Sequence, residues 1–204
     1  MPQLTLAQAF ARAPKKSTPE SPKPVSLHKP APKILFGPNG PHADFDQFSP
    51  HSVAYNGALY PTSQHLFQAF KFLHHRPDIS EQIRTAATPQ LAFDMAHSNT
   101  ASARPDWFSI NLSKMEEALF LKFSQHDQLK QELLSTSDAE LYQDSMTDSF
   151  WGVGPDLLGS NEFGRALERV RERLGGASAP VHKVLQCRVC TFAMPVALLV
   201  HPLV

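Results

Sequence analysis

Proline is concentrated at the start of the chain, where seven of the 18 prolines lie within the first 33 residues. The same segment holds five lysines and one arginine but a single acid, Glu20, so its net charge is +5 and that of the remaining 171 residues is −5. Such a segment cannot bury enough apolar surface to offset the entropy of ordering it. We therefore expect a disordered arm over residues 1–33, which leaves the rest of the chain to fold.

The first 13 residues leave three interpretations of this arm open. Leu4, Leu6 and Phe10 could form the apolar side of a short helix. Because Arg12 precedes every acid, a targeting peptide is one alternative. Residues 3–10 also resemble, weakly, a peptide that docks on a sliding clamp, with alanine in place of the first aromatic residue. The composition favours the third interpretation, a plain disordered arm.

The composition of the whole chain excludes several classes of protein. Lysine plus arginine and aspartate plus glutamate both number 19, so the chain lacks the positive charge of a general nucleic-acid binder. Hydrophobic residues make up 42%, enough for a core, but no apolar run reaches the ~18 residues of a membrane helix. Two cysteines do not make a disulfide framework. We expect a cytoplasmic or nuclear protein without a membrane partner, and a mitochondrial location stays open.

The end of the chain differs from its middle. Gly175-Gly176 is a typical helix stop, and residues 184–204 are mostly apolar but are interrupted by Pro195. We expect a folded domain over residues 34–176 and an apolar tail over residues 177–204. One Cys-x-x-Cys pair with scattered histidines is a weak metal signal, so we expect no metal and no cofactor. The side chains concerned are His182, Cys187, Cys190 and His201.

A β-hairpin is predicted at residues 52–60. Asn56-Gly57 supplies the two positive-φ positions of a tight turn between two apolar stretches. Pro61 ends the second strand, and Thr62 can cap the helix that follows. In that helix the apolar residues share one side and the polar residues share the other. The polar side consists of Gln64, Gln68, Lys71 and His75.

Five further helices are predicted from caps and periodicity. Residues 78–81, Asp-Ile-Ser-Glu, form a capping box, and Thr88-Pro89 places proline at a first helical position. A fourth helix contains residues 115–123. Asp127 can cap a fifth, and Asn161 can cap the last, whose apolar residues have the best period in the chain. Those residues are Phe163, Ala166, Leu167, Val170 and Leu174.

These elements indicate a fold class. Residues 140–144 predict one short strand, and no alternating strand–helix pattern supports a doubly wound sheet. The sequence also lacks internal repeats, a dinucleotide-binding G-x-G-x-x-G motif and a P-loop. We expect a single, mainly helical α+β domain with a short hairpin or small sheet and about six helices.

Polar segments between the apolar stretches are candidates for a binding site. They are residues 45–49, the start of the helix after the hairpin, and two loops at residues 148–152 and 159–164. Trp151, three residues after Asp148, could stack on a flat heterocycle while the carboxylate bonds sugar hydroxyls. In the alternative interpretation, Trp151 anchors the core, Asp148 forms a turn and the polar side of the helix faces solvent.

Residues 60–71, Tyr-Pro-Thr-Ser-Gln-His-Leu-Phe-Gln-Ala-Phe-Lys, resemble the central motif of the NADAR family, which is named for NAD and ADP-ribose. The likeness continues in the same order and covers roughly residues 34–174. Within the family, the fungal type resembles this chain most. The further matching segments are Arg-Pro-Asp-Trp at 104–107, Lys-Phe-Ser-Gln at 122–125, Leu-Leu-Ser-Thr at 133–136, Asp-Ser-Phe-Trp-Gly at 148–152 and Gly-Ser-Asn-Glu-Phe-Gly at 159–164.

The resemblance implies a compact, mainly helical α+β fold that hydrolyses N-glycosidic bonds between a ribose phosphate or ADP-ribose and a base or amine. One branch of the family is similar to an N-glycosidase that removes reactive intermediates of riboflavin synthesis, and another removes ADP-ribose from modified nucleobases. The implied partner is therefore a small ribosylated substrate or an ADP-ribose-like ligand, and nucleic acid only as an ADP-ribosylated substrate. Cleavage of such a bond builds oxocarbenium character, which a carboxylate can stabilise.

The resemblance also assigns site residues by position. The catalytic candidates are Gln64, Asp148 and Trp151, of which Gln64 lies where the family places a glutamate. Asp148 and Trp151 match the aspartate and the tryptophan of the family. The remaining matches are substrate-binding candidates, namely Phe36, Gln47, Phe48, His65, Gln68, Lys71, Trp107, Gly152, Asn161 and Gly164.

Two departures from the family pattern bear on activity. Gln64 and Gln143 both replace acids, and a glutamine cannot accept a proton near neutral pH. Loss of a general base typically lowers a rate by about 10²- to 10⁴-fold. The alternative function is therefore a weakened enzyme or an inactive module that binds ADP-ribose or a nucleotide. Asp148 remains as a candidate acid.

Overall fold

The computed structural model of the protein describes residues 30–175. The chain divides into two units, residues 1–30 and residues 31–204, and the fold below belongs to the second unit. The arm before residue 30, its docking peptide, the tail after residue 175 and the cysteine–histidine set in that tail all lie outside the described residues.

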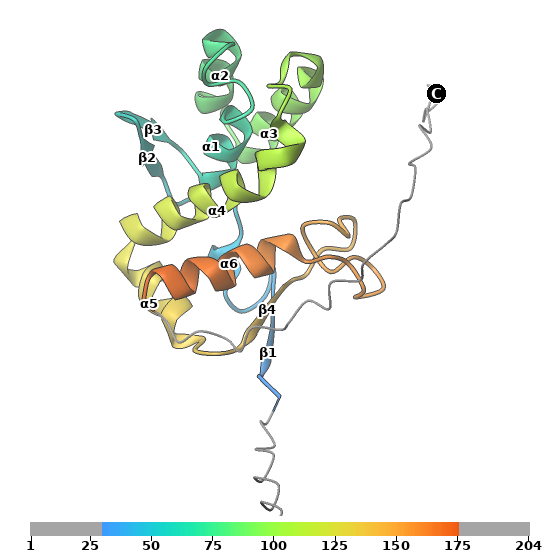
Figure 1. Cartoon of the computed structure of the whole chain (residues 1–204). Helices are drawn as coiled ribbons and strands as arrows, with labels where there is room; N and C mark the ends of the chain where they lie inside the picture. Colours follow the sequence, from blue (N-terminus) through green and yellow to red (C-terminus); the bar gives the residue numbers. More distant parts are fainter. Residues whose placement is uncertain (1–29, 176–204) are drawn as a thin grey trace, which may run out of the picture. The chain divides into compact units, whose positions relative to one another are not determined.

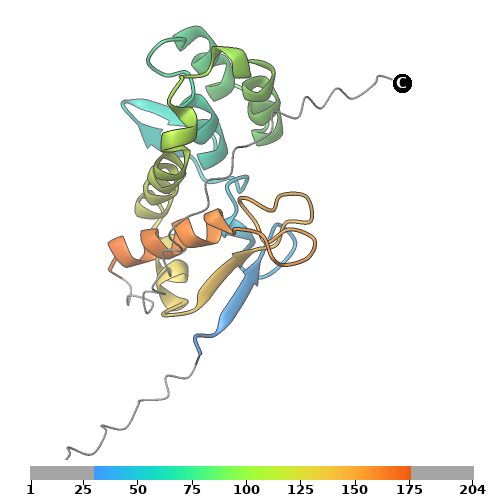
Figure 2. The same ribbon diagram turned by 45° about the vertical axis from the view of Figure 1, so that its right-hand side comes forward.

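Helix α4 lies between two groups of elements (Figure 1 and Figure 2). The bounds of the elements are β1 Lys33–Phe36, β2 Val53–Tyr55, β3 Ala58–Tyr60, α1 Ser63–Ala69, α2 Pro77–Arg84, α3 Pro89–Ser98, α4 Trp107–Gln125, α5 Asp127–Ser135, β4 Glu140–Gln143 and α6 Glu162–Arg173. One group contains the β2–β3 hairpin with α1, α2 and α3. The other contains strands β1 and β4 with α5 and α6. The described domain is thus mainly helical with two small sheets, and the predicted α+β class is confirmed.

Strands β1 and β4 form a parallel pair in which Ile34 lies opposite Leu141 and Phe36 lies opposite Gln143. The sequence predicted β4 but not β1, because β1 has four residues and its partner strand follows only near residue 140. The carboxyl ends of parallel strands lie at the same edge of a sheet. The pairing therefore brings together the two segments that follow these strands, residues 37–49 and residues 144–152.

The hairpin is confirmed. Strands β2 and β3 pair antiparallel, and the turn residues Asn56 and Gly57 have φ angles of 47° and 79°. These are the positive values that a two-residue hairpin turn requires. The chain then enters helix α1, where the Thr62 side chain accepts a hydrogen bond from the main-chain N–H of His65 at 3.4 Å.

Helices α2 and α3 both begin with proline at the first helical position. The predicted start of a helix at Thr88-Pro89 is confirmed, and the Thr88 hydroxyl accepts a hydrogen bond from the N–H of Leu91 at 3.1 Å. The predicted capping box at residues 78–81 is wrong. Because α2 already begins at Pro77, Asp78 lies inside its first turn, and its carboxylate binds the guanidinium of Arg76 at 2.8 and 3.0 Å.

The other two predicted caps also differ from the structure. Asp127 is the first residue of α5, so His126 occupies the position before it. Asn161 precedes α6 as expected, but its side chain does not cap that helix. Its Oδ1 instead accepts a hydrogen bond from the N–H of Gln143 at 2.9 Å, and its Nδ2 donates to the carbonyl of Leu141 at 2.8 Å. Asn161 therefore joins the start of α6 to strand β4.

One core connects the two groups of elements. The predicted apolar face of α6 lies within it, except that Leu174 is partly buried and packs against it. Two cationic side chains are buried with this core, Lys122 at 0% exposure and Arg171 at 1%. The Nη1 atom of Arg171 donates to the hydroxyl of Thr136 at 2.7 Å and to the carbonyl of Ala139 at 2.9 Å. Across residues 30–175, none of the helices has the length and apolar character that a membrane crossing needs.

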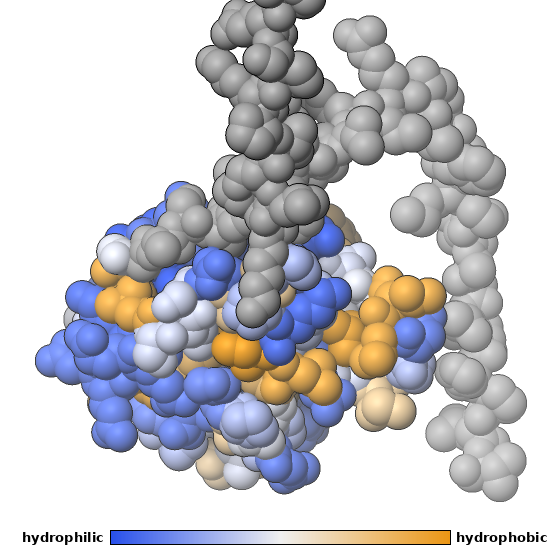
Figure 3. All heavy atoms as spheres, turned by 90° about the horizontal axis from the view of Figure 1, so that it is seen from below, coloured by the Kyte–Doolittle hydropathy of each residue, from blue (hydrophilic) through white to orange (hydrophobic). Residues whose placement is uncertain are grey.

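The loop between β4 and α6, residues 144–161, carries exposed apolar side chains. Figure 3 shows apolar surface gathered on the right of the face seen from below, where this loop lies in Figure 1. The largest exposures in the loop are 84% at Leu158 and 68% at Met146. The exposed apolar side chains of the loop are Met146, Phe150, Leu157 and Leu158.

Candidate active site at helix α1

Helix α1 is buried on every side, although three of its seven residues carry polar side chains that are longer than serine. Gln64 is 1% exposed and Gln68 is 2% exposed. The interpretation of this polar side as a solvent-facing stripe is therefore wrong. The helix ends at Ala69, so His75 does not share it. Periodicity correctly grouped the glutamines, but neighbouring segments cover them.

Three buried amide oxygens near this helix have no hydrogen-bond partner within the part of the chain that the structure describes. They are the Oε1 atoms of Gln47, Gln64 and Gln68. Most buried polar atoms in proteins are paired, and an unpaired acceptor costs about 1–3 kcal/mol. A ligand that brings N–H or O–H donors would pair these oxygens.

The segment around Gln47 lies directly against the start of α1. The main-chain carbonyl of Gln47 accepts a hydrogen bond from the N–H of Gln64 at 3.1 Å and another from the hydroxyl of Ser63 at 3.2 Å. The structure thus brings together two predicted site residues that are 17 positions apart in the sequence. Both residues also carry a buried side-chain oxygen without a partner.

Lys71 lies two residues after the end of α1 and adds a cation. Its Nζ atom lies 5.3 Å from the ring centroid of Trp107, which is close enough for a cation–π interaction. Burial lowers the pKa of Lys71 to about 8 from its ordinary 10.5. The Trp107 ring in turn contacts the ring of Phe67 on α1, with 5.2 Å between their centroids.

Trp151 packs against the same helix from the other direction. Its ring lies edge-on to Phe67, with 5.5 Å between the centroids. The loop that carries Trp151 is shaped by Asp148, whose Oδ1 accepts hydrogen bonds from the N–H groups of Phe150 at 2.9 Å and Trp151 at 2.8 Å. The structure therefore places the predicted tryptophan beside α1 and gives the Asp148 carboxylate a part in forming the turn.

The segment from Gly159 to Gly164 is bound to this loop by main-chain hydrogen bonds. The N–H of Asn161 donates to the carbonyl of Gly152 at 3.1 Å, and the N–H of Phe163 donates to that of Trp151 at 3.0 Å. A Cβ atom on Gly152 would lie 2.5 Å from Cβ of Ser145, which leaves no space for a side chain. The three predicted segments therefore form one continuous region.

Strand β4 connects this region to the Gln47 segment. The Nε2 atom of Gln143, the last residue of the strand, donates to Oδ2 of Asp46 at 3.3 Å. Both side chains are 8% exposed. The carbonyl of Gln143 accepts a hydrogen bond from the N–H of Val153 at 3.0 Å, next to Gly152. Asp46 thus links the two polar loops, which the sequence had named separately.

The remaining predicted binding residues have other surroundings. His65 uses both ring nitrogens inside the protein, Nδ1 with the hydroxyl of Thr62 at 2.9 Å and Nε2 with the carbonyl of Ala86 at 3.2 Å. Burial lowers the pKa of His65, which favours the neutral ring. Phe36 is buried against Phe45, and Phe48 is 36% exposed at the surface.

Gly164 is required by packing. A Cβ atom there would clash with the carbonyl oxygen of Leu141 and lie 2.6 Å from Nδ2 of Asn161. This glycine allows α6 to approach strand β4 closely. Its role is therefore to position Asn161, which holds the end of the strand that carries Gln143.

Sequence reasoning missed three residues of this region. Asp46 lies inside the polar segment 45–49 but received no role of its own. Lys122 belongs to a matched motif, yet nothing in the sequence indicates that a lysine would be fully buried. Phe67 was assigned to the core, and it also joins the rings of Trp107 and Trp151. In each case the missing information was a contact across the fold.

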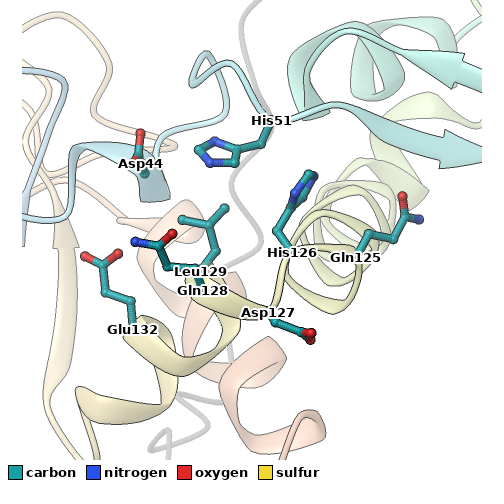
Figure 4. A pocket seen from close by; sticks show the side chains of 8 residues that line it. All are labelled: Asp44, His51, Gln125, His126, Asp127, Gln128, Leu129 and Glu132. Carbon is teal, nitrogen blue, oxygen red and sulfur yellow. The ribbon is translucent and has the colours of Figure 1, made fainter.

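Two cavities lie outside the glutamine cluster. One of about 320 Å³ lies beside His51 and His126, whose ring centroids are 5.1 Å apart (Figure 4). The other, of about 400 Å³, lies at the end of β1 and is lined by Phe36 and Asp144 among others. Neither is lined by Gln64, Gln68 or Lys71. Over residues 30–175, no three histidine, cysteine or acidic side chains are grouped so that they could hold a metal ion.

The arrangement combines features that suit a ribosylated heterocycle. Buried acceptors, a lysine of lowered pKa and aromatic rings lie on or against helix α1 and the residues that follow it. The only buried acidic side chain among residues 30–175, Asp46, belongs to the segment that binds the start of this helix. Aromatic rings can stack on a base, and a cation can hold a phosphate. A carboxylate can activate water or stabilise an oxocarbenium ion.

Comparison with known proteins agrees with this arrangement. The NADAR domain matches residues 35–175. The chain is 36% identical to an N-glycosidase of Nostoc punctiforme over 135 residues, 66% of this chain and 86% of that protein. It is 34% identical to the N-glycosidase YbiA of Escherichia coli over 140 residues, 69% of this chain and 86% of that protein.

A solved structure extends the comparison to the fold. The NMR structure of E. coli YbiA superimposes with a TM-score of 0.64 at 34% identity and covers 70% of this chain and 84% of the other. A riboflavin biosynthesis protein of maize, PYRR, is 35% identical over 153 residues, which make up 25% of its length. With its whole domain matched in sequence and in fold, the chain belongs to the NADAR family.

Proposed function

We propose that this chain is an N-glycosidase that hydrolyses the bond between a ribose phosphate and a nitrogen of a base or amine. Membership of the NADAR family supports the reaction type, since relatives that are covered over 86% of their length bear the name N-glycosidase. The observation that carries the proposal is the set of three buried, unpaired amide oxygens on α1 and the segment bound to its start, together with the buried Lys71 that follows the helix.

The residues divide this work by chemistry. The ammonium of Lys71 would hold the phosphate, and the rings of Trp107 and Trp151 would flank the base. The oxygens of Gln64 and Gln68 would accept hydrogen bonds from ribose hydroxyls or from amino groups of the base. Because these acceptors and rings are in place before binding, little ordering is required when the substrate enters.

We also propose a substrate class from these groups. Unpaired acceptor oxygens favour a leaving group rich in N–H, such as an aminopyrimidine. An ADP-ribosyl nucleobase would present the same bond together with a larger phosphate group. The related riboflavin biosynthesis protein of maize makes a ribosylaminopyrimidine phosphate the first substrate to test.

The test is release of free base by the purified full-length chain. The protein is incubated with a ribosylaminopyrimidine phosphate, an ADP-ribosyl nucleobase and an unmodified nucleoside, and the free base is quantified by chromatography. We expect release from at least one of the first two and none from the nucleoside, which lacks a phosphate for Lys71. Binding of ribose 5-phosphate without any base release would instead support the inactive binding module.

A further inference from the structure

The proposed reaction needs a carboxylate, and the residues assigned from the family motif supply it poorly. Gln64 is neutral, and Oδ1 of Asp148 already accepts two main-chain hydrogen bonds that shape its turn. Asp46 differs from Gln64 in its charge and from the half-buried Asp148 in its deeper burial. It is the only buried acidic side chain in residues 30–175, at 8% exposure, and it lies where the two polar loops meet.

The contacts of Asp46 hold its carboxylate in one place. Oδ1 accepts a hydrogen bond from the N–H of Phe48 at 2.8 Å, and Oδ2 accepts one from Nε2 of Gln143 at 3.3 Å. No lysine, arginine or histidine among residues 30–175 forms a salt bridge with it within 4.0 Å. A buried carboxylate without an ion pair is costly to a fold, so its retention suggests a use.

A buried lysine fixes the segment that carries this acid. Nζ of Lys122 donates to the main-chain carbonyls of Asp44 at 2.6 Å and Asp46 at 2.7 Å, and to the hydroxyl of Ser49 at 2.6 Å. Burial lowers the pKa of Lys122 to about 7, and the charges of Asp46 and Asp44 act in the opposite direction. Two of these bonds use main-chain carbonyls and the third uses the Ser49 hydroxyl, so the carboxylate of Asp46 is left to Phe48 and Gln143.

We propose that Asp46 supplies the carboxylate of the N-glycosidase reaction, in place of an acid at position 143 on the other side of the same hydrogen bond. This inference rests on the proposed function. The C1′–N bond of the substrate breaks, and its electron pair leaves with the base nitrogen, which takes a proton from solvent. A water molecule forms the new C1′–O bond, and the Asp46 carboxylate accepts the proton that this water loses. The net change is addition of one water across the bond.

The hydrogen bond between positions 46 and 143 allows a swap experiment. Asp46→Asn removes the charge but keeps an oxygen for the N–H of Phe48. Combined with Gln143→Glu, it returns a carboxylate to the opposite side of the same contact. Asp44→Asn is the matched control, because Asp44 belongs to the same segment but is exposed, and Lys122 binds its main chain.

We expect Asp46→Asn to lower the rate of base release by about 100-fold or more, which is the usual effect of removing an acid–base group. The double variant should recover at least about tenfold of that loss, and Asp44→Asn should stay within about twofold of the unsubstituted chain. Ribose 5-phosphate should bind to all of them with similar affinity. Circular dichroism and thermal melting establish that each variant is folded.

Two results would overturn the assignment of Asp46. One is a folded Asp46→Asn variant that keeps activity within about threefold of the unsubstituted chain. The other is a folded double variant that is no more active than Asp46→Asn. If Asp46→Asn alone does not fold, the double variant decides, since a 100-fold loss in it contradicts the proposal and near-normal activity supports it. An unsubstituted chain that releases no base from any substrate contradicts the proposed function itself.

Discussion

Helix α1 and the β4–α6 loop reverse the usual distribution of polar and apolar side chains in opposite ways. The helix buries Gln64 and Gln68 almost completely, and the loop exposes Leu157 at 64% and Leu158 at 84%. The two departures differ in energy. A buried acceptor without a donor costs about 1–3 kcal/mol, whereas single exposed apolar side chains are common and substitutions of them usually change stability by about 0.5 kcal/mol or less. The glutamines are therefore the stronger indication of a ligand.

The main chain of the β4–α6 loop is extensively hydrogen-bonded, although the loop exposes apolar side chains. Residues 148–153 and 159–163 are joined by five hydrogen bonds of 2.7 to 3.1 Å between their N–H and carbonyl groups. The loop is thus a fixed support with apolar side chains outside, and it holds Trp151 against Phe67. We therefore expect the loop to be rigid where it faces α1 and to tolerate substitutions where it faces solvent.

The largest expected effect comes from breaking that support at Gly159. A Cβ atom there would lie 2.5 Å from the carbonyl oxygen of Gly152 and 2.7 Å from that of Ser149. Main-chain atoms cannot move aside cheaply, so Gly159→Ala should lower the free energy of unfolding by about 3 kcal/mol. Urea denaturation measures this effect. Gly40→Ala is the matched control, since the nearest atom to a Cβ there is 3.8 Å away; equal losses in both variants would contradict the explanation.

The second prediction concerns the buried polar side of α1. Gln68→Met keeps the length of the side chain and removes the unpaired oxygen, so the ligand-free protein should gain about 1 kcal/mol in the free energy of unfolding. Affinity for ribose 5-phosphate or the aminopyrimidine substrate should fall about tenfold, the loss of roughly one hydrogen bond. Thermal melting and calorimetric titration measure the two effects.

A control separates this effect from a general response to methionine. Gln82→Met changes an exposed glutamine of α2, and neither stability nor affinity should move measurably. If Gln68→Met destabilises the protein and leaves binding intact, the Gln68 oxygen has a structural role and its assignment to the ligand is wrong.

The sequence predicted the features that depend on residues close together in the chain. The hairpin at Asn56-Gly57, the helix start at Thr88-Pro89 and the apolar face of α6 all depend on residues within a few positions of one another, and all three predictions are confirmed. Strand β1 escaped prediction because four residues carry little periodicity and their partner is remote. Local signals thus identified most of the elements, and contacts across the fold determined how they combine.

For the candidate site, the sequence grouped residues but could not show their surroundings. Periodicity placed Gln64 and Gln68 on one face, yet it carries no information about which segments cover that face. Asp46 and Gln143 are 97 positions apart, and only the pairing of β1 with β4 makes their hydrogen bond. Resemblance to a family assigned candidate site residues by position, and it drew attention away from Asp46, to which the motif gives no role.

The third prediction concerns the pH dependence of phosphate binding by the buried Lys71. Burial lowers the pKa of Lys71 to about 8, so the ammonium that would hold a phosphate is lost as pH rises through 8. Affinity for ribose 5-phosphate should therefore fall about fivefold between pH 7 and pH 9. Lys71→Arg should remove this dependence because a guanidinium stays charged. A flat profile for the unsubstituted chain would contradict a role of Lys71 in phosphate binding.

Stability should change in the opposite direction. The unfolded chain keeps the Lys71 proton up to its ordinary pKa of 10.5, and the folded protein releases it near 8. Between these values the unfolded state binds more protons, so this residue makes the free energy of unfolding rise with pH. Lys71→Met should lack this contribution, which urea denaturation at pH 7.5 and pH 9.5 can measure.

The smallest expected effect separates backbone strain from apolar exposure in the β4–α6 loop. Leu157 has a φ of 62°, a left-handed conformation that leucine rarely adopts and asparagine tolerates. Leu157→Asn should therefore raise the free energy of unfolding by about 0.5–1 kcal/mol. Leu158→Asn removes a similar apolar surface from a residue without positive φ and should change stability by no more than about 0.5 kcal/mol. Base release should be unchanged in both variants, since both side chains are largely exposed. If the free energy of unfolding rises equally in both variants, the exposed apolar surface of the loop, and not its backbone strain, lowers the stability of the fold. The exposed leucines would then indicate a partner as strongly as the buried glutamines indicate a ligand.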